Sequence, residues 1–571
     1  MFSPHRARII GTRHMAAAGQ YLSAQAAFQI LEAGGNAIDA GVAGGIALGV
    51  VQSEYVSFGG VAPIMIYLAK TSEVITISGL GYWPKATRLE VINYEHGGTI
   101  PAGLLQTVTP AAPDAWITAL ERYGTMSYGD VAQAALRFAR EGFAVPSLMS
   151  KIITDLEHDY RRWPQNASIY MPKGRPPLPG ERLVQSDLAT TIQYMIDEER
   201  SAAAKGGRIA GLRAAHDAFY RGDIAKRIVQ YHRENGGWFR EEDLAEFRSE
   251  VAPALKTTFQ DIDFYFCGPW CQGPVLGQTL NVLNGMDIKS MGHNSPAYVH
   301  VITEAFKLAY ADRHELYGDP NFVPVPIWEL MSAEYAARRR REINPGKAHP
   351  GMPASGLPSR WGQVPAKATP AALEKTQLDT SFICVVDRHG NAFAATPSDG
   401  SGESPIIPGL GFAPSSRGTQ SWTNPGAPAV LGPGRRPRLT PAPALARKPG
   451  EWIMPFGSPG NDVQPQAMLQ VFLNMHVWGM TPQAAIDEPR FATFSYPRSS
   501  APHPYQPGLL NLENRLPQST LDSLRALGHR AEFWPDWTML AGGVCAIFAD
   551  ERTGMMEGGS DPRRPTGIAG W

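Results

Sequence analysis

The sequence predicts an α+β protein built from helices and antiparallel strand pairs, and three observations support this fold class. Short runs of apolar and β-branched residues occur in pairs separated by brief polar turns. Residues 112–250 carry a mostly helical pattern. The 58 glycines and 49 prolines exceed the roughly 12% that these two residues usually make up, which indicates many turns and loops rather than a helical bundle.

The first elements are marked by a cap and by a hairpin pattern. Ser23 to Ala33 predicts a helix, with Ser23 as its N-cap and Gly34-Gly35 as its stop. Ile64–Leu68 and Glu73–Ile77 are β-rich runs on either side of a short polar turn, so they predict a hairpin.

The clearest helix of the chain begins at Pro296, because Ser295 supplies a capping hydroxyl before a proline at the first helical position. The segment from Asn344 to Pro370 is rich in Pro, Gly, Ala and Ser and has no lasting periodicity. We therefore expect residues 344–370 to be a flexible linker.

The last third continues with strands and one further helix. Phe382–Val386 and Ala392–Thr396 predict a hairpin, since a short Gly- and Asn-containing turn separates them. Ser401 to Pro437 reads as a long functional loop. An amphipathic helix is expected over Gln466–Trp478, and a closing hairpin over 544–549 and 555–558.

Composition excludes several classes of function. The formal net charge is −1, so no overall field favours nucleic acid or an anionic membrane. No apolar run approaches the ~20 residues that a membrane helix needs, and no secretory signal is visible. Cys267 and Cys271 lack the second cysteine pair of a zinc site. We expect a cytoplasmic protein without disulfides, metal or cofactor, and with neither nucleic acid nor membrane as a partner.

The most informative stretch is Asp379-Thr380-Ser381-Phe382, which places a hydroxyl residue at the head of a predicted strand. If the chain is cut before Thr380, this residue gains a free α-amine beside its hydroxyl, so base and nucleophile lie in one residue. Without the cut, Thr380 is an ordinary threonine in a strand, where β-branched residues are common. The junction thus predicts a self-processing amide hydrolase or acyl transferase, or else a large globular protein without that chemistry.

Motifs along nearly the whole chain resemble the γ-glutamyltransferase family of N-terminal-nucleophile hydrolases. Each is modest alone, but five in the family's order are specific. In chain order they are residues 23–40, 304–320, 385–392, Gly457-Ser458-Pro459-Gly460 and Gly559-Ser560-Asp561-Pro562-Arg563.

This resemblance implies a four-layer αββα fold and autocatalytic cleavage between Asp379 and Thr380. The products would be a large subunit, residues 1–379, and a small subunit, residues 380–571, that stay together as a heterodimer; whether such heterodimers pair again is left open. Thr380 would attack an amide carbonyl and form an acyl-enzyme, with Ser398 in place of a second threonine that hydrogen-bonds the nucleophile. Gly460 and Asn461 would hold the oxyanion.

The chain departs from the family at the residues that would grip a γ-glutamyl group. Leu80-Gly81 replaces an Arg-Glu pair, Leu439 and Thr440 replace two serines, and Thr419 and Gln420 replace an acidic pair. Arg417 and Arg438 fall on pocket-lining motifs, and with Thr440 they are our candidate substrate-binding residues. Their charge favours an anionic acyl group. The alternative is that both arginines are solvated or pair with acids such as Asp399 and Asp462.

The sequence therefore predicts an autoprocessed N-terminal-threonine amidohydrolase that cleaves the amide of a small acidic substrate. Two alternatives stay open: a true γ-glutamyltransferase or glutathione hydrolase with substitute contacts, and an uncleaved, inactive homologue that serves as a binding protein.

Overall fold

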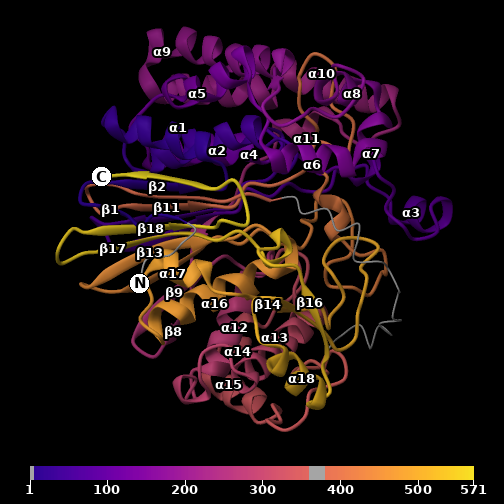
Figure 1. Cartoon of the computed structure of the whole chain (residues 1–571). Helices are drawn as coiled ribbons and strands as arrows, with labels where there is room; N and C mark the ends of the chain where they lie inside the picture. Colours follow the sequence, from indigo (N-terminus) through magenta and orange to yellow (C-terminus); the bar gives the residue numbers. More distant parts are fainter. Residues whose placement is uncertain (1–5, 359–379) are drawn as a thin grey trace.

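The computed structural model describes residues 6–358 and 380–571, in which two seven-stranded sheets lie face to face between two layers of helices (Figure 1). The four-layer αββα arrangement expected from the sequence is confirmed. The junction residue Asp379 and the second half of the expected linker, residues 359–370, lie outside the described residues.

One sheet, here called the Thr380 sheet, carries the predicted nucleophile at the head of its third strand. Its order is β19 (Gly567–Gly570), β2 (Met15–Ala18), β10 (Ile383–Val386), β11 (Ala392–Ala395), β3 (Ile64–Leu68), β4 (Glu73–Ile77) and β7 (Val251–Pro253), with every neighbouring pair antiparallel. Both hairpins predicted here, β3 with β4 and β10 with β11, are confirmed.

The other sheet, here called the Gly460 sheet, leads into the predicted oxyanion loop. Its order is β1 (Ile9–Gly11), β18 (Met556–Ser560), β17 (Cys545–Asp550), β13 (Trp452–Gly457), β12 (Ala444–Lys448), β9 (Ile262–Phe266) and β8 (Leu255–Phe259). The predicted hairpin of β17 and β18 is present but does not close the chain, because β19 follows it and joins the Thr380 sheet.

Helices cover the outer face of the Thr380 sheet. They are α1 (Tyr21–Glu32), α2 (Ala37–Val51), α4 (Ala112–Tyr123), α5 (Tyr128–Glu141) and α9 (Ser186–Tyr220), with α3 (Leu89–Glu95), α6 (Ser147–Asp155), α7 (Glu157–Arg161), α8 (Pro164–Tyr170), α10 (Asp223–Glu234), α11 (Glu241–Ala245) and the ribbon of β5 (Phe143–Ala144) and β6 (Arg182–Leu183) around them. The helical pattern predicted for residues 112–250 is confirmed. Gly44 lets α2 lie directly on the sheet, since a Cβ there would come within 2.1 Å of Ile383 on β10.

A second set of helices covers the Gly460 sheet (Figure 1). It comprises α12 (Gly273–Leu283), α13 (Pro296–Leu316), α14 (Ile327–Leu330), α15 (Ala333–Arg340), α16 (Gln464–His476), α17 (Pro482–Asp487) and α18 (Gln518–Ala526), beside a small sheet of β14 (Phe491–Thr493), β15 (Leu509–Glu513) and β16 (Arg530–Trp534). The Ser295 hydroxyl accepts a hydrogen bond from Tyr298 N, as the predicted cap requires.

The first part of the expected linker is packed against the fold. Ala348 N donates to Leu527 O at 2.7 Å, and Lys307 Nζ donates to His349 O at 2.8 Å. In the described residues no helix is both long and apolar enough to pass through a bilayer.

An apolar layer joins the two sheets and sets the distance between their ends. Phe382, at the head of β10, packs so closely on Gly457, at the end of β13, that a Cβ at 457 would lie 2.3 Å from the Phe382 ring. Only glycine fits at 457 without displacing that ring. This contact places Thr380 and the loop that follows Gly457 at the same end of the sandwich.

Candidate active site

The Thr380 hydroxyl faces a second hydroxyl across two neighbouring strands. Thr380 and Ser398 form an isolated antiparallel bridge just beyond the β10–β11 hairpin, and their Oγ atoms are 2.8 Å apart. Both side chains are fully buried. The predicted nucleophile and its predicted hydroxyl partner are thus in direct contact.

Arg417 lies behind Ser398 and restricts what its hydroxyl can do. An Arg417 Nη2–H group donates to Ser398 Oγ, and Arg417 Nε lies 3.3 Å from Asp399 Oδ1. Because a guanidinium has no acceptor, Ser398 accepts from it and can still donate its own proton, for example to Thr380 Oγ1. The geometry therefore favours the ion-pair alternative for Arg417: its charge is matched by Asp399.

Asp399 is held in place from several directions. The Ser415 hydroxyl donates to Asp399 Oδ2 at 2.8 Å, and the Ser416 hydroxyl donates to Asp399 Oδ1 at 3.0 Å. Its backbone has a φ of 98°, a left-handed conformation that is strained for a residue with a side chain. Burial raises the pKa of Asp399, although Arg417 opposes this shift. The strained turn serves to place this carboxylate beside Arg417.

The predicted oxyanion loop, residues 457–461, has the backbone geometry of a tight turn. Gly460 has a φ of 120° and Asn461 a φ of 50°, so a Cβ at 460 would be strained whatever the space around it. The Gly460 N–H donates to no acceptor within the described part of the chain. Backbone N–H groups without an acceptor of their own are the kind of donor that oxyanion holes use.

A buried ion pair holds Asp462, the residue that directly follows the predicted oxyanion loop. Arg313 on α13 contacts Asp462, whose carboxylate also accepts from Ser499 Oγ at 2.6 Å. Gln272 Nε2 donates to the carbonyl oxygens of Thr440 and Asn461, both at 2.8 Å. Arg313 lies in the motif 304–320, but no role was predicted for it, and Gln272 lies outside all the predicted motifs.

Arg438 differs from Arg417 in that no acid among residues 6–358 and 380–571 forms an ion pair with it. Its Nη1 donates to Arg313 O at 2.9 Å, while Nε and Nη2 have no hydrogen-bond partner in the described residues. The side chain is only 1% exposed. Burial, followed by the charge of Arg313, lowers the pKa of Arg438 to about 9. The nearby Asp462 is engaged by Arg313, so Arg438 holds two unused donors in a buried position.

Thr440 is paired with Gln420 rather than left open. Gln420 Nε2 donates to Thr440 Oγ1 at 2.9 Å, and Thr440 N donates to Gln420 Oε1 at 3.0 Å. The reciprocal pair fixes the segment between Arg438 and β12. Leu80, which stands where the resemblance places a guanidinium, is buried in the same apolar cluster as Leu439.

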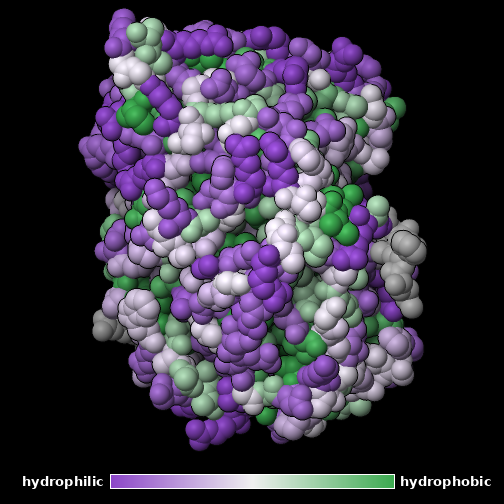
Figure 2. All heavy atoms as spheres, turned by 90° about the vertical axis from the view of Figure 1, so that its left-hand side faces the viewer, coloured by the Kyte–Doolittle hydropathy of each residue, from purple (hydrophilic) through white to green (hydrophobic). Residues whose placement is uncertain are grey.

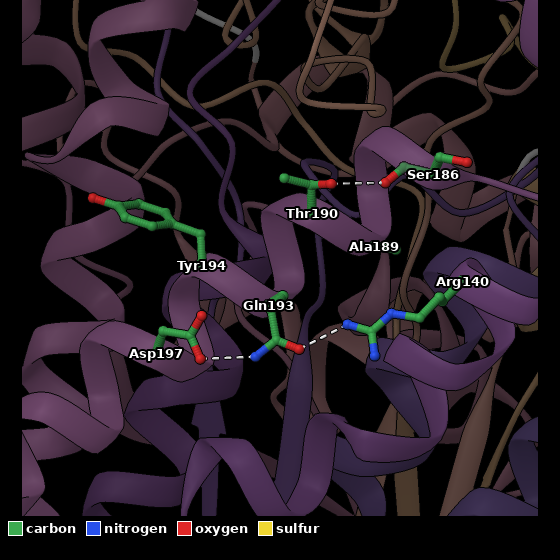
Figure 3. A pocket seen from close by; sticks show the side chains of 7 residues that line it. All are labelled: Arg140, Ser186, Ala189, Thr190, Gln193, Tyr194 and Asp197. Atoms are coloured by element: carbon green, nitrogen blue, oxygen red, sulfur yellow. Dashed lines mark hydrogen bonds between the residues drawn. The ribbon is translucent and has the colours of Figure 1, made fainter.

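A surface pocket on the outer helices is lined by Arg140, Gln193, Tyr194 and Asp197, among others, and by none of the residues described above. Figure 3 shows its polar side chains bonded to one another. Gln193 accepts from Arg140 at 2.8 Å and donates to Asp197 at 2.8 Å. On the face in Figure 2, hydrophilic residues dominate and hydrophobic ones form small separate areas.

One buried cluster has ligand atoms at metal-binding distances. His300, Glu304 and His529 place theirs within 4.8 Å of one another in the described part of the chain. The Lys307 ammonium, however, already donates to Glu304 Oε1 at 2.7 Å, and the two imidazoles hydrogen-bond each other at 2.8 Å. A buried cation on the carboxylate disfavours a second cation there.

Comparisons with known proteins agree with this geometry. A family model described as gamma-glutamyltranspeptidase matches residues 23–571. The glutathione hydrolase-like YwrD proenzyme of Bacillus subtilis is 30% identical over 97% of this chain and 98% of its own length. The oxamate amidohydrolase proenzyme of Klebsiella pneumoniae is 27% identical over 98% of this chain and 99% of its own.

A solved structure extends the likeness to three dimensions. The crystal structure of cephalosporin acylase from Bacillus halodurans superposes with a TM-score of 0.85 and 26% identity, covering 100% of this chain and 98% of the other. The sheets and the threonine-bearing strand end described above therefore belong to a known enzyme architecture. The chain is a member of the gamma-glutamyltranspeptidase family.

Proposed function

We propose that this protein is an autocatalytically processed amidohydrolase whose nucleophile is Thr380 and whose substrate is a small amide with an acidic acyl part. The observation that carries the proposal is the 2.8 Å contact between the Thr380 and Ser398 hydroxyls at the strand end beside the oxyanion loop. Autocleavage between Asp379 and Thr380 would release the α-amine of Thr380. The two fragments would then remain together as a heterodimer.

The chemistry follows from the positions of the groups. In the processed protein the α-amine of Thr380 takes the hydroxyl proton, directly or through water, and Oγ1 attacks the amide carbonyl. Ser398 donates its hydrogen bond to Oγ1 while the negative charge develops. The Gly460 and Asn461 N–H groups hold the oxyanion, and the leaving amine takes a proton as the C–N bond breaks. Water or an acceptor amine then resolves the acyl-enzyme.

Arg438 supports an acidic acyl part. A buried guanidinium with two unused donors favours a carboxylate, which can accept both hydrogen bonds and neutralise the charge. One relative, named for its action on oxamate, handles a small amide whose acyl part carries a carboxylate. Arg417 supports the reaction indirectly, by orienting Ser398. Thr440 contributes by fixing the segment that carries Arg438.

A second candidate function is a glutathione hydrolase, which the name of the Bacillus subtilis relative favours. Leu80 and Leu439 argue against it, because they replace groups that would hold a glutamate α-carboxylate with apolar packing. An uncleaved binding protein is the remaining alternative.

A denaturing gel and an amide screen test the proposal together. Wild type should give two fragments, and Thr380→Ala a single band of 571 residues. Thr380→Ser, which keeps a hydroxyl, should still process and turn over substrate. The processed protein is then offered oxalyl, succinyl and glutaryl monoamides and a γ-glutamyl anilide. A single wild-type band, or a strong preference for the anilide, would refute the proposal.

A further inference from the structure

The two sheets give the region around Thr380 two distinct sides. In the Gly460 sheet, β13 lies between β12 and β17, so the oxyanion loop has the segment before β12 on one side and the segment before β17 on the other. The first segment carries Arg438 and Thr440. The second, residues 541–544, is flanked by Arg564.

The Thr380 sheet repeats this division. Thr380 leads β10, which has β11 on one side and β2 on the other, with β19 next to β2. Ser398 follows β11, and Arg564 lies just before β19. Figure 1 shows the C-terminal strand beside β2. Arg564 and Arg438 therefore lie on opposite sides of the nucleophile and its oxyanion loop.

Arg564 reaches toward the oxyanion loop from its side. Its Nε donates to Gly542 O at 3.3 Å and its Nη2 to Met539 O at 3.1 Å. A Cβ on Gly543 would lie 2.4 Å from Arg564 Cδ and 3.0 Å from Pro459 Cγ. The Arg564 side chain thus packs in one cluster with Pro459, the residue just before Gly460.

One donor of Arg564 is unused. Nη1 has no partner in the described residues, and the side chain is 4% exposed. The only carboxylate that faces it without an ion pair of its own among the described residues belongs to Glu54, in the turn after α2. Glu54 Oε2 is likewise buried and without a partner, and no contact within 4.0 Å joins the two groups. Arg564 and Glu54 thus each bury a polar atom without a partner, and such an atom is costly to leave unpaired unless a bound group completes it.

We propose that Arg564 and Glu54 form a second anion-binding position, which receives a carboxylate on the amine leaving group. If Arg438 takes the acyl part, the opposite side of Thr380 takes what leaves, because the acyl and amine portions extend in opposite directions from the carbonyl. The substrate class is then a dicarboxylic acyl group in amide linkage to an amino acid. This inference rests on the proposed function of Thr380.

Glu54 fits such a position in its protonated form. Burial raises the pKa of Glu54 to about 8, although the charge of Arg564 opposes this shift. The other polar groups near Glu54 are the hydroxyls of Tyr55, Tyr160 and Tyr170. The backbone hydrogen bond from Ser401 N to Ser53 O lies beside them. Below that pH the neutral acid donates to a carboxylate; above it, its own charge repels one.

The test compares leaving groups that differ in one charge. For the acyl group that the amide screen selects, kcat/KM is measured on its glycine conjugate and on its glycinamide conjugate, which lacks only the carboxylate. We expect wild type to favour the glycine conjugate at least tenfold, and Arg564→Met to bring the ratio close to one. Arg564→Lys should keep part of the preference for the glycine conjugate. Arg552→Met, an exposed arginine in the β17–β18 turn, should keep the wild-type ratio.

The pH dependence supplies a second arm. The wild-type ratio should fall between pH 7 and pH 9, and Glu54→Gln, which cannot ionise, should hold it constant over that range. Equal turnover of both conjugates by wild type would overturn this inference and leave the proposed function standing. No turnover of any amide by fully processed protein would instead overturn the proposed function. A ratio that survives Arg564→Met in folded enzyme would also reject the role of Arg564.

Discussion

Arg417 donates a hydrogen bond to Ser398, and Ser398 Oγ in turn lies 2.8 Å from Thr380 Oγ1. The chemistry of Arg417 fixes the direction of the first of these two hydrogen bonds. Arg417 can only donate, so Ser398 accepts from it and can donate its own proton to Thr380 Oγ1. On the proposed function, a serine can serve at this position, because it supplies the same hydroxyl as the threonine that the resemblance places there.

Removing the Ser398 hydroxyl should slow the reaction without abolishing it. A hydrogen bond to a charged group contributes about 1.5–3 kcal/mol, so Ser398→Ala should lower kcat by roughly 10- to 100-fold. Ser398→Thr, which keeps the hydroxyl, is the matched control and should stay within a few-fold of wild type. Single-turnover rates on processed protein are the measurement, with the processed fraction read from a gel. Equal rates for Ser398→Ala and wild type would mean that the contact is only structural.

Arg417 and Asp399 should behave as a coupled pair. Arg417→Met leaves the buried Asp399 carboxylate uncompensated, and breaking a buried pair in this way costs about 3–5 kcal/mol of stability. The double variant Arg417→Met with Asp399→Asn removes both charges, so it should recover much of that stability but not the rate, because Ser398 stays unoriented. Thermal melts and kcat for all four proteins complete the cycle. Additive stability losses would contradict the pairing.

The sequence predicted the site unevenly, and the reason is physical. Hairpins and caps are local, so β3–β4, β10–β11 and the Ser295 cap follow from adjacent residues. The Thr380–Ser398 contact follows from the same hairpin. Arg313 meets Asp462, and Arg564 meets the 539–543 segment, only because distant strands are neighbours in the sheets. That information is in the topology. The different states of Arg417 and Arg438 could not be predicted either. The sequence does not show that Asp399 meets Arg417, or that Asp462 meets Arg313 instead of Arg438.

Replacing Arg438 should raise the stability of the protein and lower its selectivity for acidic substrates. A buried guanidinium without an acid is destabilising, so Arg438→Met should raise the Tm of the ligand-free protein. The same change should lower kcat/KM for a dicarboxylic monoamide by about 10- to 100-fold relative to a neutral amide of equal length, since the charge-assisted hydrogen bonds are lost. Arg438→Lys tests whether charge alone is enough. A lower Tm together with unchanged selectivity would show that Arg438 is a structural residue.

The Arg313–Asp462 pair should make the assembly of the two fragments sensitive to acid. Burial opposes ionisation of Asp462, but Arg313 and the hydrogen bonds from Ser499 outweigh it, so the pKa of Asp462 lies below its ordinary value. A carboxyl whose pKa is lower in the folded state adds stability above its unfolded pKa of about 3.9, and that stability is lost as pH falls through the folded pKa. If cleavage occurs at Thr380, Arg313 belongs to the large fragment and Asp462 to the small one.

Asp462→Asn should therefore be less stable than wild type at pH 7 and should lose less stability between pH 5 and the acid transition. Asp522→Asn, at an exposed position on α18, is the control and should follow wild type. Urea unfolding at several pH values measures the slopes, and size-exclusion chromatography after acid exposure measures whether the fragments separate. An Asp462→Asn slope equal to that of wild type would assign the acid sensitivity to other buried carboxylates, Glu513 and Asp561. Burial raises the pKa of both groups, but their arginine partners outweigh it, so both pKa values are lowered in the folded protein.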